Sequence, residues 1–391
     1  MQIDLDHYYK LISKNSEMKK HLVTSCRGPW VYHGDTKKLD LHSGNSAFIY
    51  GFTDDDLMAA RNSCNSYFVN NSDTETHDQI TKLINRLETH TGMTAFTWAV
   101  SGSDAVEASI AVNDHYWQTQ GEDKPTILVL DRCYHGTTYL VKSFRGNAPW
   151  VRHVTAHAPR WIKIEDREEQ ERICIEDIQK QISTNNKIGA VLLESIPWIA
   201  GILPFSNNFW HQVRDLCTQY NVNLIIDDVA GCFGKLGNIV SHTTFQIEPD
   251  IVAIGKALTG GYVPFGGALV CDRINQAVKD AKWDHTHTWC PVMDGIFLAN
   301  VMIDKLEKDL PKVPYIEKRF TDIMKKYEIH SKGQGLFQEI CRPTSEQDLY
   351  ECDLLITLRS ENSIKVLLPI IADDEYFEFL DKAMAKLVSL K

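Results

Sequence analysis

Short apolar runs alternate with segments of helical periodicity from about residue 95 to 275, and this alternation constrains the fold more than any other feature. A continuous apolar run is typical of a strand buried on both faces, and amphipathic helices separate such strands in parallel sheets. The pattern therefore predicts an α/β domain with a mostly parallel, helix-covered sheet. The strand runs are 95–100, 126–131, 189–195, 223–229, 250–255 and 266–272, and the helical segments are 104–120, 175–184 and 207–221.

The segments on either side lack this alternation. A long helical segment near residues 292–310 is followed by short strand-like runs and by a terminal helix at 373–390. We predict a smaller α+β lobe built from residues 1–50 and 281–391, beside a large α/β domain of residues 51–280. One face of the terminal helix is expected to pack on a core, through Phe379, Leu380, Ala383, Met384 and Leu387 at helical spacing.

The composition excludes several kinds of partner. With 391 residues and 43% hydrophobic content, the chain is long enough to bury a large core. Its net charge of −11, without any block of like charge, gives a nucleic acid no electrostatic footprint, so we expect no nucleic-acid partner. The most apolar stretch, 188–205, contains Glu194, Ser195 and two prolines, which favours a buried strand and loop over a membrane span.

The N-terminal segment and the cysteines bear on the cellular location. The first 20 residues lack the apolar core and the small-residue cleavage site of a signal peptide. The ten cysteines show no C-x-x-C spacing, which indicates reduced thiols rather than disulfides or a zinc site. We therefore expect a cytoplasmic protein with no membrane partner, in which most cysteines are small core residues.

Ligands of open parallel sheets bind beyond the carboxyl ends of the strands, so the residues that follow each predicted strand are candidates for a site. Ser101, Gly102 and Ser103 follow the first strand and lead directly into a helix. The unpaired N–H groups and the dipole at such a helix start can bind a phosphate. These residues alone favour the simpler interpretation, in which Ser103 caps the helix.

Aromatic and histidine residues occur at two further positions. Tyr134 and His135 follow the run at 126–131, where an aromatic ring usually serves packing but can also stack on a flat ligand. His285 and His287 share a face if the chain is extended there. No carboxylate or cysteine pair at zinc spacing accompanies them, which favours a loop over a metal site.

Three carboxylates close two of the apolar strands, namely Glu194, Asp227 and Asp228. A buried carboxylate is costly unless a cation or a hydrogen-bond donor meets it, so each of them is expected to have such a partner. Neighbouring residues on a strand point to opposite faces, so only one of the two aspartates can face a given site. For that reason we expect no metal at this position.

Lys256 follows the apolar run at 250–255 and precedes small residues and glycines. A lysine stem can simply lie along apolar surface with its ammonium group in water. Together, however, the candidates comprise a phosphate-binding turn, an aromatic ring, a strand-end acid and a strand-end lysine. Pyridoxal 5'-phosphate (PLP) needs all four, because its phosphate, ring face, ring nitrogen and aldehyde each require one of them. We therefore predict PLP as the cofactor.

Longer segments resemble the class III aminotransferases of fold type I, which have a large domain with a mostly parallel seven-stranded sheet and a smaller α+β lobe. Residues 100–110 resemble the phosphate loop of that family, and 133–138 resemble its Tyr-His-Gly motif. Residues 224–237 resemble its Asp-Glu-Val segment and glycine-rich turn, and 249–270 resemble its lysine segment. Residues 32–44 resemble its N-terminal strands. The match runs through most of the chain, in the same order and spacing.

The resemblance implies a role for each candidate. Lys256 would form the Schiff base with the cofactor and carry the proton at the substrate carbon, and Asp227 would keep the pyridine nitrogen protonated. Tyr134 would stack on one face of the ring and Val229 would lie on the other. The further implied cofactor contacts are Gly102 and Ser103 at the phosphate, His135 of the Tyr-His-Gly motif, and Glu194 near the active centre.

A threonine of the neighbouring subunit also reaches the phosphate in this family. Thr286 is the matching position without gaps, and Thr288 is the match if two residues are deleted. The resemblance therefore implies a homodimer whose active site lies at the interface.

The chain departs from the family pattern at three places. Ala230 stands where a glutamine often contacts the ring hydroxyl, and Ser195 stands where a proline usually follows the glutamate. An arginine-containing segment before a double proline is replaced by Lys365 and the single Pro369. Because lysine cannot grip a carboxylate by two parallel bonds as arginine does, the sequence leaves open whether the substrate carries an α-carboxylate there.

The expected activity is transamination between an amine donor and a carbonyl acceptor. Other PLP reactions on the same fold, such as those of an aminomutase, racemase or decarboxylase, would use the same cofactor residues. A cofactor-binding sensor or scaffold without turnover would have no physical need for both Lys256 and Asp227. A dinucleotide-dependent oxidoreductase would need a G-x-G-x-x-G fingerprint, which the sequence lacks.

Overall fold

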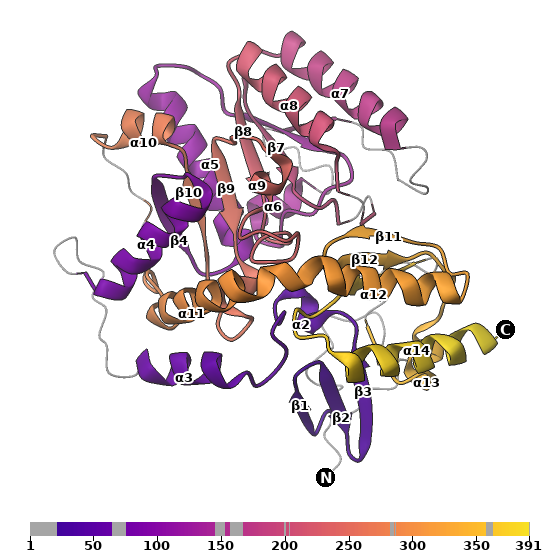
Figure 1. Ribbon diagram of the computed structural model, residues 1–391. Coiled ribbons are helices and arrows are strands. Elements are labelled where there is room, and N and C mark those ends of the chain that lie inside the picture. Colours follow the sequence, from indigo (N-terminus) through magenta and orange to yellow (C-terminus); the bar gives the residue numbers. More distant parts are fainter. Residues whose placement is uncertain are drawn as a thin grey trace.

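The computed structural model describes residues 22–64, 76–144, 153–156, 167–198, 201–202, 204–281, 285, 287–356 and 363–390. Its centre is a seven-stranded sheet of order β4-β10-β9-β8-β7-β5-β6, with helices on both sides (Figure 1). The α/β architecture predicted from the sequence is thus confirmed. The strands are β4 (Ala95–Ala99), β5 (Thr126–Leu130), β6 (His153–Ala156), β7 (Ile188–Glu194), β8 (Asn223–Asp227), β9 (Ile251–Ile254) and β10 (Gly266–Val270).

Most neighbouring strands of this sheet are parallel. Strands β6, β5, β7, β8 and β9 pair in parallel, whereas β10 runs antiparallel to both β9 and β4. The six predicted strand runs agree with the structure to within one or two residues at each end. They were predictable because each is a continuous apolar run.

Helices cover both faces of the sheet. Helix α5 (Gly102–Thr119) packs on one face, and α7 (Arg167–Thr184) and α8 (Asn207–Gln219) pack on the other. Because successive strand residues point to opposite faces, the neighbours Leu224 and Ile225 belong to two different hydrophobic clusters. Helix α7 begins earlier than its apolar periodicity predicts, since its first turns are polar.

Helix α11 (Met293–Asp309) is the long helix expected near residues 292–310, and it packs across α3, α4 and the short 3-10 helix η3 (Figure 1). It therefore lies against two helices that precede the sheet strands in sequence and against η3, which lies between β9 and β10. The remaining elements of this part are α3 (Asp55–Ser63), α4 (Asp78–Thr91), α6 (Tyr139–Ser143), α9 (Ser241–Phe245), η3 (Lys256–Thr259) and α10 (Asp272–Val278).

The two flanks of the chain meet in a small sheet of order β1-β2-β3-β13, in which β13 of the C-terminal flank pairs in parallel with β3. A second small sheet has the order β11-β12-β14. The boundaries 1–50, 51–280 and 281–391 remain a proposal. The helices and strands of the two flanks are β1 (Ser25–Arg27), β2 (Trp30–His33), β3 (Thr36–Asp40), α2 (Ser43–Ser46), η4 (Leu310–Lys312), α12 (Val313–Lys326), β11 (Ser331–Gln334), β12 (Phe337–Ile340), α13 (Glu346–Glu351), β13 (Leu354–Leu355), β14 (Ile364–Leu367) and α14 (Asp374–Ser389).

The terminal helix α14 packs through a wider face than predicted. Leu380, Ala383, Met384 and Leu387 are buried as expected, but Tyr376 and Phe377 are buried as well. Phe379 is only half-buried, and its ring meets the edge of Trp30 at a centroid distance of 5.1 Å.

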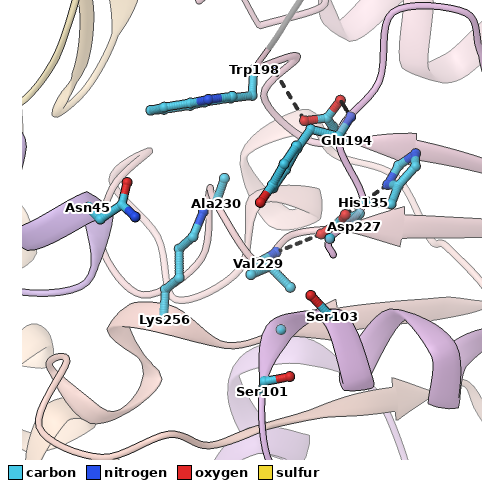
Figure 2. A pocket seen from close by; sticks show the side chains of 13 residues that line it. Asn45, Ser101, Ser103, His135, Glu194, Trp198, Asp227, Val229, Ala230 and Lys256 are labelled. Atoms are coloured by element: carbon cyan, nitrogen blue, oxygen red, sulfur yellow. Dashed lines mark hydrogen bonds and ion pairs between the residues drawn. The ribbon is translucent and has the colours of Figure 1, made fainter. Parts of the chain in front are cut away.

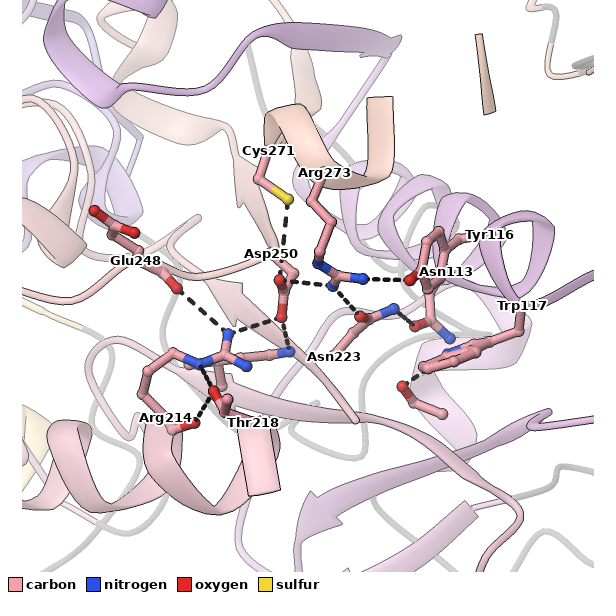
Figure 3. A network of polar contacts seen from close by, with 12 residues as sticks. Asn113, Tyr116, Trp117, Arg214, Thr218, Asn223, Glu248, Asp250, Cys271 and Arg273 are labelled. Carbon is pink, nitrogen blue, oxygen red and sulfur yellow. Dashed lines mark hydrogen bonds and ion pairs between the residues drawn. The ribbon is translucent and has the colours of Figure 1, made fainter. Parts of the chain in front are cut away.

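A polar network ties β8, β9 and α5 together at the amino ends of the strands (Figure 3). The Asp250 carboxylate accepts hydrogen bonds from Arg214 and Arg273, each at 2.8 Å, and from the Leu224 backbone N–H at 2.7 Å. Asn223 links this cluster to Asn113 of α5. The network therefore lies at the opposite end of these strands from their carboxyl ends.

None of the helices in the described parts of the chain is long and apolar enough to cross a bilayer. All ten cysteines are free thiols, and seven of them are buried, as expected for small core residues.

Candidate active site

A cavity of about 170 Å³ opens beyond the carboxyl ends of the central strands (Figure 2). Its lining brings together residues that lie up to 211 positions apart, from 45 to 256. The sequence candidates among its lining residues are Gly102, Ser103, Tyr134, His135, Glu194, Asp227, Val229 and Lys256.

The start of α5 forms one wall of this cavity. Ser101 is the N-cap, and its Oγ accepts a hydrogen bond from the Asp104 backbone N–H at 3.2 Å. The simpler interpretation of Ser103 as the cap is therefore wrong, because the helix begins at Gly102, two residues before the predicted start. Ser103 Oγ instead accepts from the Thr137 N–H at 3.1 Å, at the rim of the cavity.

Asp227 ends β8 with its carboxylate at the cavity. Its Oδ2 lies 2.8 Å from Nδ1 of the fully buried His135 side chain, and its Oδ1 accepts from the Val229 N–H at 3.1 Å. Burial lowers the pKa of His135, but interactions with Cys133 and the hydrogen bond with Asp227 outweigh burial and raise it well above its ordinary value. The contact with the imidazole thus fixes the orientation of the Asp227 carboxylate.

Glu194 ends β7 and bridges two parts of the cavity wall. Its carboxylate accepts from the backbone N–H of Tyr134 at 2.9 Å and of Trp198 at 3.2 Å (Figure 2). Both of these partners are backbone hydrogen-bond donors. Burial raises the pKa of Glu194 to about 7, the charge interaction with His135 opposes this effect, and the negative charge of Asp227 adds to it.

Asp228 points away from the cavity, as the strand alternation predicts. Its carboxylate accepts from the backbone N–H of Ser241 at 2.8 Å and from the Ser241 hydroxyl. Burial raises the pKa of Asp228 to about 6. The two neighbouring aspartates thus have separate surroundings, one at the cavity and one in the core.

Lys256 follows β9 and Gly255 and begins η3. Its backbone φ is 47°, in the left-handed region, where a residue with a side chain is held at a cost of about 1–2 kcal/mol. Its side chain points into the cavity, and Nζ lies 5.8 Å from the centroid of the Trp198 ring. Strain of this kind is concentrated at functional sites in proteins.

Two lining residues, Asn45 and Trp198, were not identified as site residues from the sequence, whereas Ser101 and Gly136 belong to the turn and the motif singled out there. Trp198 lies four positions after Glu194, and the apolar run around it reads as core. The glycine in "HSGNS" is the one sequence signal near Asn45, whose φ of 66° is left-handed. Ala230, noted above as a departure from the family pattern, also lines the cavity.

The two candidate threonines are not among the lining residues of this cavity. Thr286 lies outside the described residues. Thr288 is described and exposed, in a turn next to the exposed Trp289. The neighbouring His285 and His287 lie in a loop, as the sequence predicts. No group of three or more metal-ligating side chains occurs in the described ranges.

The residues present fit PLP. The start of α5 offers N–H donors to a phosphate, Asp227 offers an oriented carboxylate and Lys256 offers an amine. A Cβ at Gly102 would lie 2.4 Å from Val229 Cγ1, and one at Gly136 would lie 2.3 Å from Ser103 Oγ. Glycine at these two positions therefore keeps the cradle open.

Comparisons with known proteins agree with this geometry. The family model described as aminotransferase class-III matches residues 11–375. Acetylornithine aminotransferase of Clostridium acetobutylicum is 27% identical over 298 residues, covering 73% of each chain. That of Haemophilus ducreyi is 24% identical over 381 residues, covering 92% of this chain and 91% of the relative.

The solved structures share the fold. A PLP-bound amine transaminase from an uncultivated Pseudomonas species has a TM-score of 0.85 at 19% identity, covering 97% of this chain and 96% of that one. A transaminase from the marine bacterium Virgibacillus has a TM-score of 0.86 at 20% identity, covering 98% of each chain. With the family match across nearly the whole sequence, the chain belongs to the class III aminotransferases and is a PLP-dependent transaminase.

Proposed function

We propose that Lys256 is the catalytic residue of this aminotransferase, linking the cofactor as a Schiff base and moving the proton at the substrate carbon. The observation that carries the proposal is that Lys256, Asp227 and the start of α5 line one cavity. When bound, PLP supplies an aldehyde that condenses with amines and a ring that draws electron density from the substrate carbon. Lys256 has to be neutral to attack and to accept the proton, and it lies partly buried in the cavity wall.

Asp227 is the residue proposed to hold the protonated ring nitrogen. Its carboxylate accepts from His135 and Val229, which leaves further acceptor capacity on the oxygens. His135 is proposed to act through Asp227, by holding its carboxylate in place.

Other wall residues are proposed to bind and orient the cofactor. Gly102 and Ser103 would hold the phosphate through the start of α5, and Tyr134 and Val229 would enclose the ring. Glu194 is proposed to position Tyr134 rather than to touch the cofactor, because its carboxylate already accepts the Tyr134 N–H.

A homodimer with the active site at the interface is part of the proposal. Thr288 or Thr286 of the partner subunit would complete the phosphate site. Thr288 is exposed in its own chain, and the adjacent Trp289 exposes 74% of its surface, which is unusual for a large apolar side chain. A cytoplasmic location is also proposed, supported by the ten free thiols.

A half-reaction tests the proposed function. PLP-loaded protein is mixed with single amine donors and amino acids in the absence of a carbonyl acceptor, and the visible absorbance of the cofactor is followed. At least one donor should bleach the absorbance, and a carbonyl acceptor added afterwards should restore it. If every donor leaves the absorbance unchanged, transamination by this chain is contradicted.

A further inference from the structure

Trp198 lies beside the reactive lysine but has no part in the roles proposed above. The residue is 7% exposed and lines the same cavity as Lys256. Figure 2 shows the Lys256 side chain pointing toward the indole, with its Nζ 5.8 Å from the ring centroid. A substrate whose amine reaches Lys256 therefore brings its nearest substituent close to the indole.

Three segments of the chain hold this indole in place. The Trp198 backbone N–H donates to Glu194, and the Lys365 ammonium group on β14 donates to the Trp198 carbonyl. The ring of His42, from the N-terminal flank, stacks on the indole at a centroid distance of 5.3 Å and an interplanar angle of 27°. An aromatic ring supported in this way is a preorganised wall.

Lys365 contributes to this wall at a position where the resemblance predicts an arginine. Its Nζ lies 4.7 Å from the indole centroid, within the range of a cation–π contact. At least one of its hydrogen bonds goes to the Trp198 carbonyl. The position thus supports an aromatic surface, and a lysine lacks the fork that grips a carboxylate with two bonds.

On the basis of the function proposed above, we propose that Trp198 determines which amine donor the cavity accepts, favouring a donor with a flat, apolar substituent on the reacting carbon. The indole face offers such a substituent an offset stacking contact and removal from water. A small substituent leaves that face uncovered. Trp198 is therefore a specificity-determining residue of the reaction.

Two donors with the same reacting group test the inference. Benzylamine and ethylamine both carry the amine on a CH2 group, but one bears a ring and the other a methyl group. The bleaching half-reaction is measured with PLP-loaded wild type, Trp198→Phe and Trp198→Ala. The wild type should prefer benzylamine, and Trp198→Ala should reduce that preference about tenfold, mainly through KM, as expected for one lost aromatic contact. Trp198→Phe keeps a flat ring and should retain most of the preference.

A binding measurement separates the contact with the Trp198 indole from the reaction of the amine. Benzyl alcohol has the ring but no amine, so it cannot react at Lys256. Its dissociation constant, measured by calorimetry, should rise about tenfold in Trp198→Ala and little in Trp198→Phe. If Trp198→Ala does not fold, Trp198→Leu takes its place, because leucine fills space without offering a flat face.

Each outcome decides the inference. An unchanged donor preference together with unchanged benzyl alcohol affinity overturns it, and so does a wild type that does not prefer benzylamine. Faster reaction of benzylamine with Trp198→Ala also overturns it, since the indole would then be an obstruction. If the wild type reacts with no amine at all, the proposed function fails instead, and the benzyl alcohol titration still tests the wall.

Discussion

Asp227 and Asp228 are adjacent in sequence, but their side chains point in different directions and lie in different surroundings. Asp227 meets His135 and the cavity, whereas Asp228 meets Ser241 in the core. The sequence predicts this division, because successive strand residues alternate between faces. It does not reveal the partner of either aspartate, because His135 lies 92 positions from Asp227, and Ser241 lies 13 positions from Asp228 beyond a series of turns.

Replacement of Asp227 tests the proposed charge on the ring nitrogen. Asp227→Asn keeps the shape but removes the negative charge, so kcat/KM should fall about 10²–10³-fold, as for the loss of one preorganised electrostatic partner. Steady-state kinetics with a donor found active in the half-reaction checks this. Asp228→Asn is the matched control, because it should lower stability and leave the rate per folded molecule unchanged. Equal rates for the Asp227→Asn variant and wild type would refute the role.

Glu194 gives stability a pH dependence of defined sign. Burial raises its pKa from 4.5 to about 7, so between these values the folded state holds more protons than the unfolded state. Its contribution to stability therefore falls as the pH rises from about 4.5 to about 7 and is level above. Glu194→Gln does not titrate, so urea unfolding should show the wild type losing stability relative to this variant over that interval. A wild type whose stability relative to Glu194→Gln stays constant or rises between about pH 4.5 and 7 would contradict the argument.

Several site residues could not be predicted because the sequence carries no distinctive signal for them. Lys256 and Asp227 are recognisable, since a charged residue at the end of an apolar strand is unusual. Trp198 reads as one more core residue in an apolar stretch, and its contacts with Lys365 and His42 depend on tertiary structure.

At the scale of elements, the candidate site lies at the carboxyl ends of the sheet strands, and a polar network stabilises their amino ends. The Asp250 network joins the amino ends of β8 and β9 to α5 and α8, through Asn223 and two arginines (Figure 3). The cavity lies at the carboxyl ends of the same strands. The Asp250 network therefore stabilises the sheet at the end of the strands that lies away from the cavity.

Asp250→Asn should destabilise the protein without changing its chemistry. It leaves Arg214 and Arg273 facing a neutral group, and should lower the free energy of unfolding by about 1.5–3 kcal/mol, the worth of one hydrogen bond to a charged group. Urea unfolding checks the value. Asp123→Asn is the control, because its ion pair with Lys187 is exposed and should contribute little. A comparable loss from both variants would contradict the role of the network.

The sequence predicts the helices and strands that have a clear apolar pattern, and it misses features that such a pattern does not encode. It misses β6, because the residues HVTA contain no continuous apolar run and the strand pairs on one side only, at the sheet edge. It cannot show that β10 runs antiparallel, since periodicity carries no direction. It also misses the start of α7, where polar residues give no amphipathic signal.

At the scale of the whole molecule, the cavity is proposed to be completed by a second subunit. A single chain cannot supply this information, and Thr286 lies outside the described residues. The exposed Trp289, adjacent to Thr288, is the feature that most favours an interface there.

A charge at position 289 should separate the proposed subunits. Trp289→Asp should weaken dimerisation about thirtyfold or more, as for an aromatic hot spot, and the resulting monomer should bind PLP poorly. Sedimentation velocity and a PLP titration measure the two effects. Tyr315→Asp is the control, because Tyr315 is 56% exposed on α12, away from the candidate threonines in sequence. A monomeric variant with unchanged PLP affinity would refute a shared phosphate site.

The covalent attachment point is the most direct test of the whole account. Borohydride reduction of the PLP-loaded protein followed by peptide mapping should place the cofactor mass on the peptide that contains Lys256. Lys235 is the natural competitor, because it is fully buried and burial lowers its pKa to about 8. Attachment at Lys256 alone is the predicted result, and attachment at Lys235 or any other lysine would contradict the central claim.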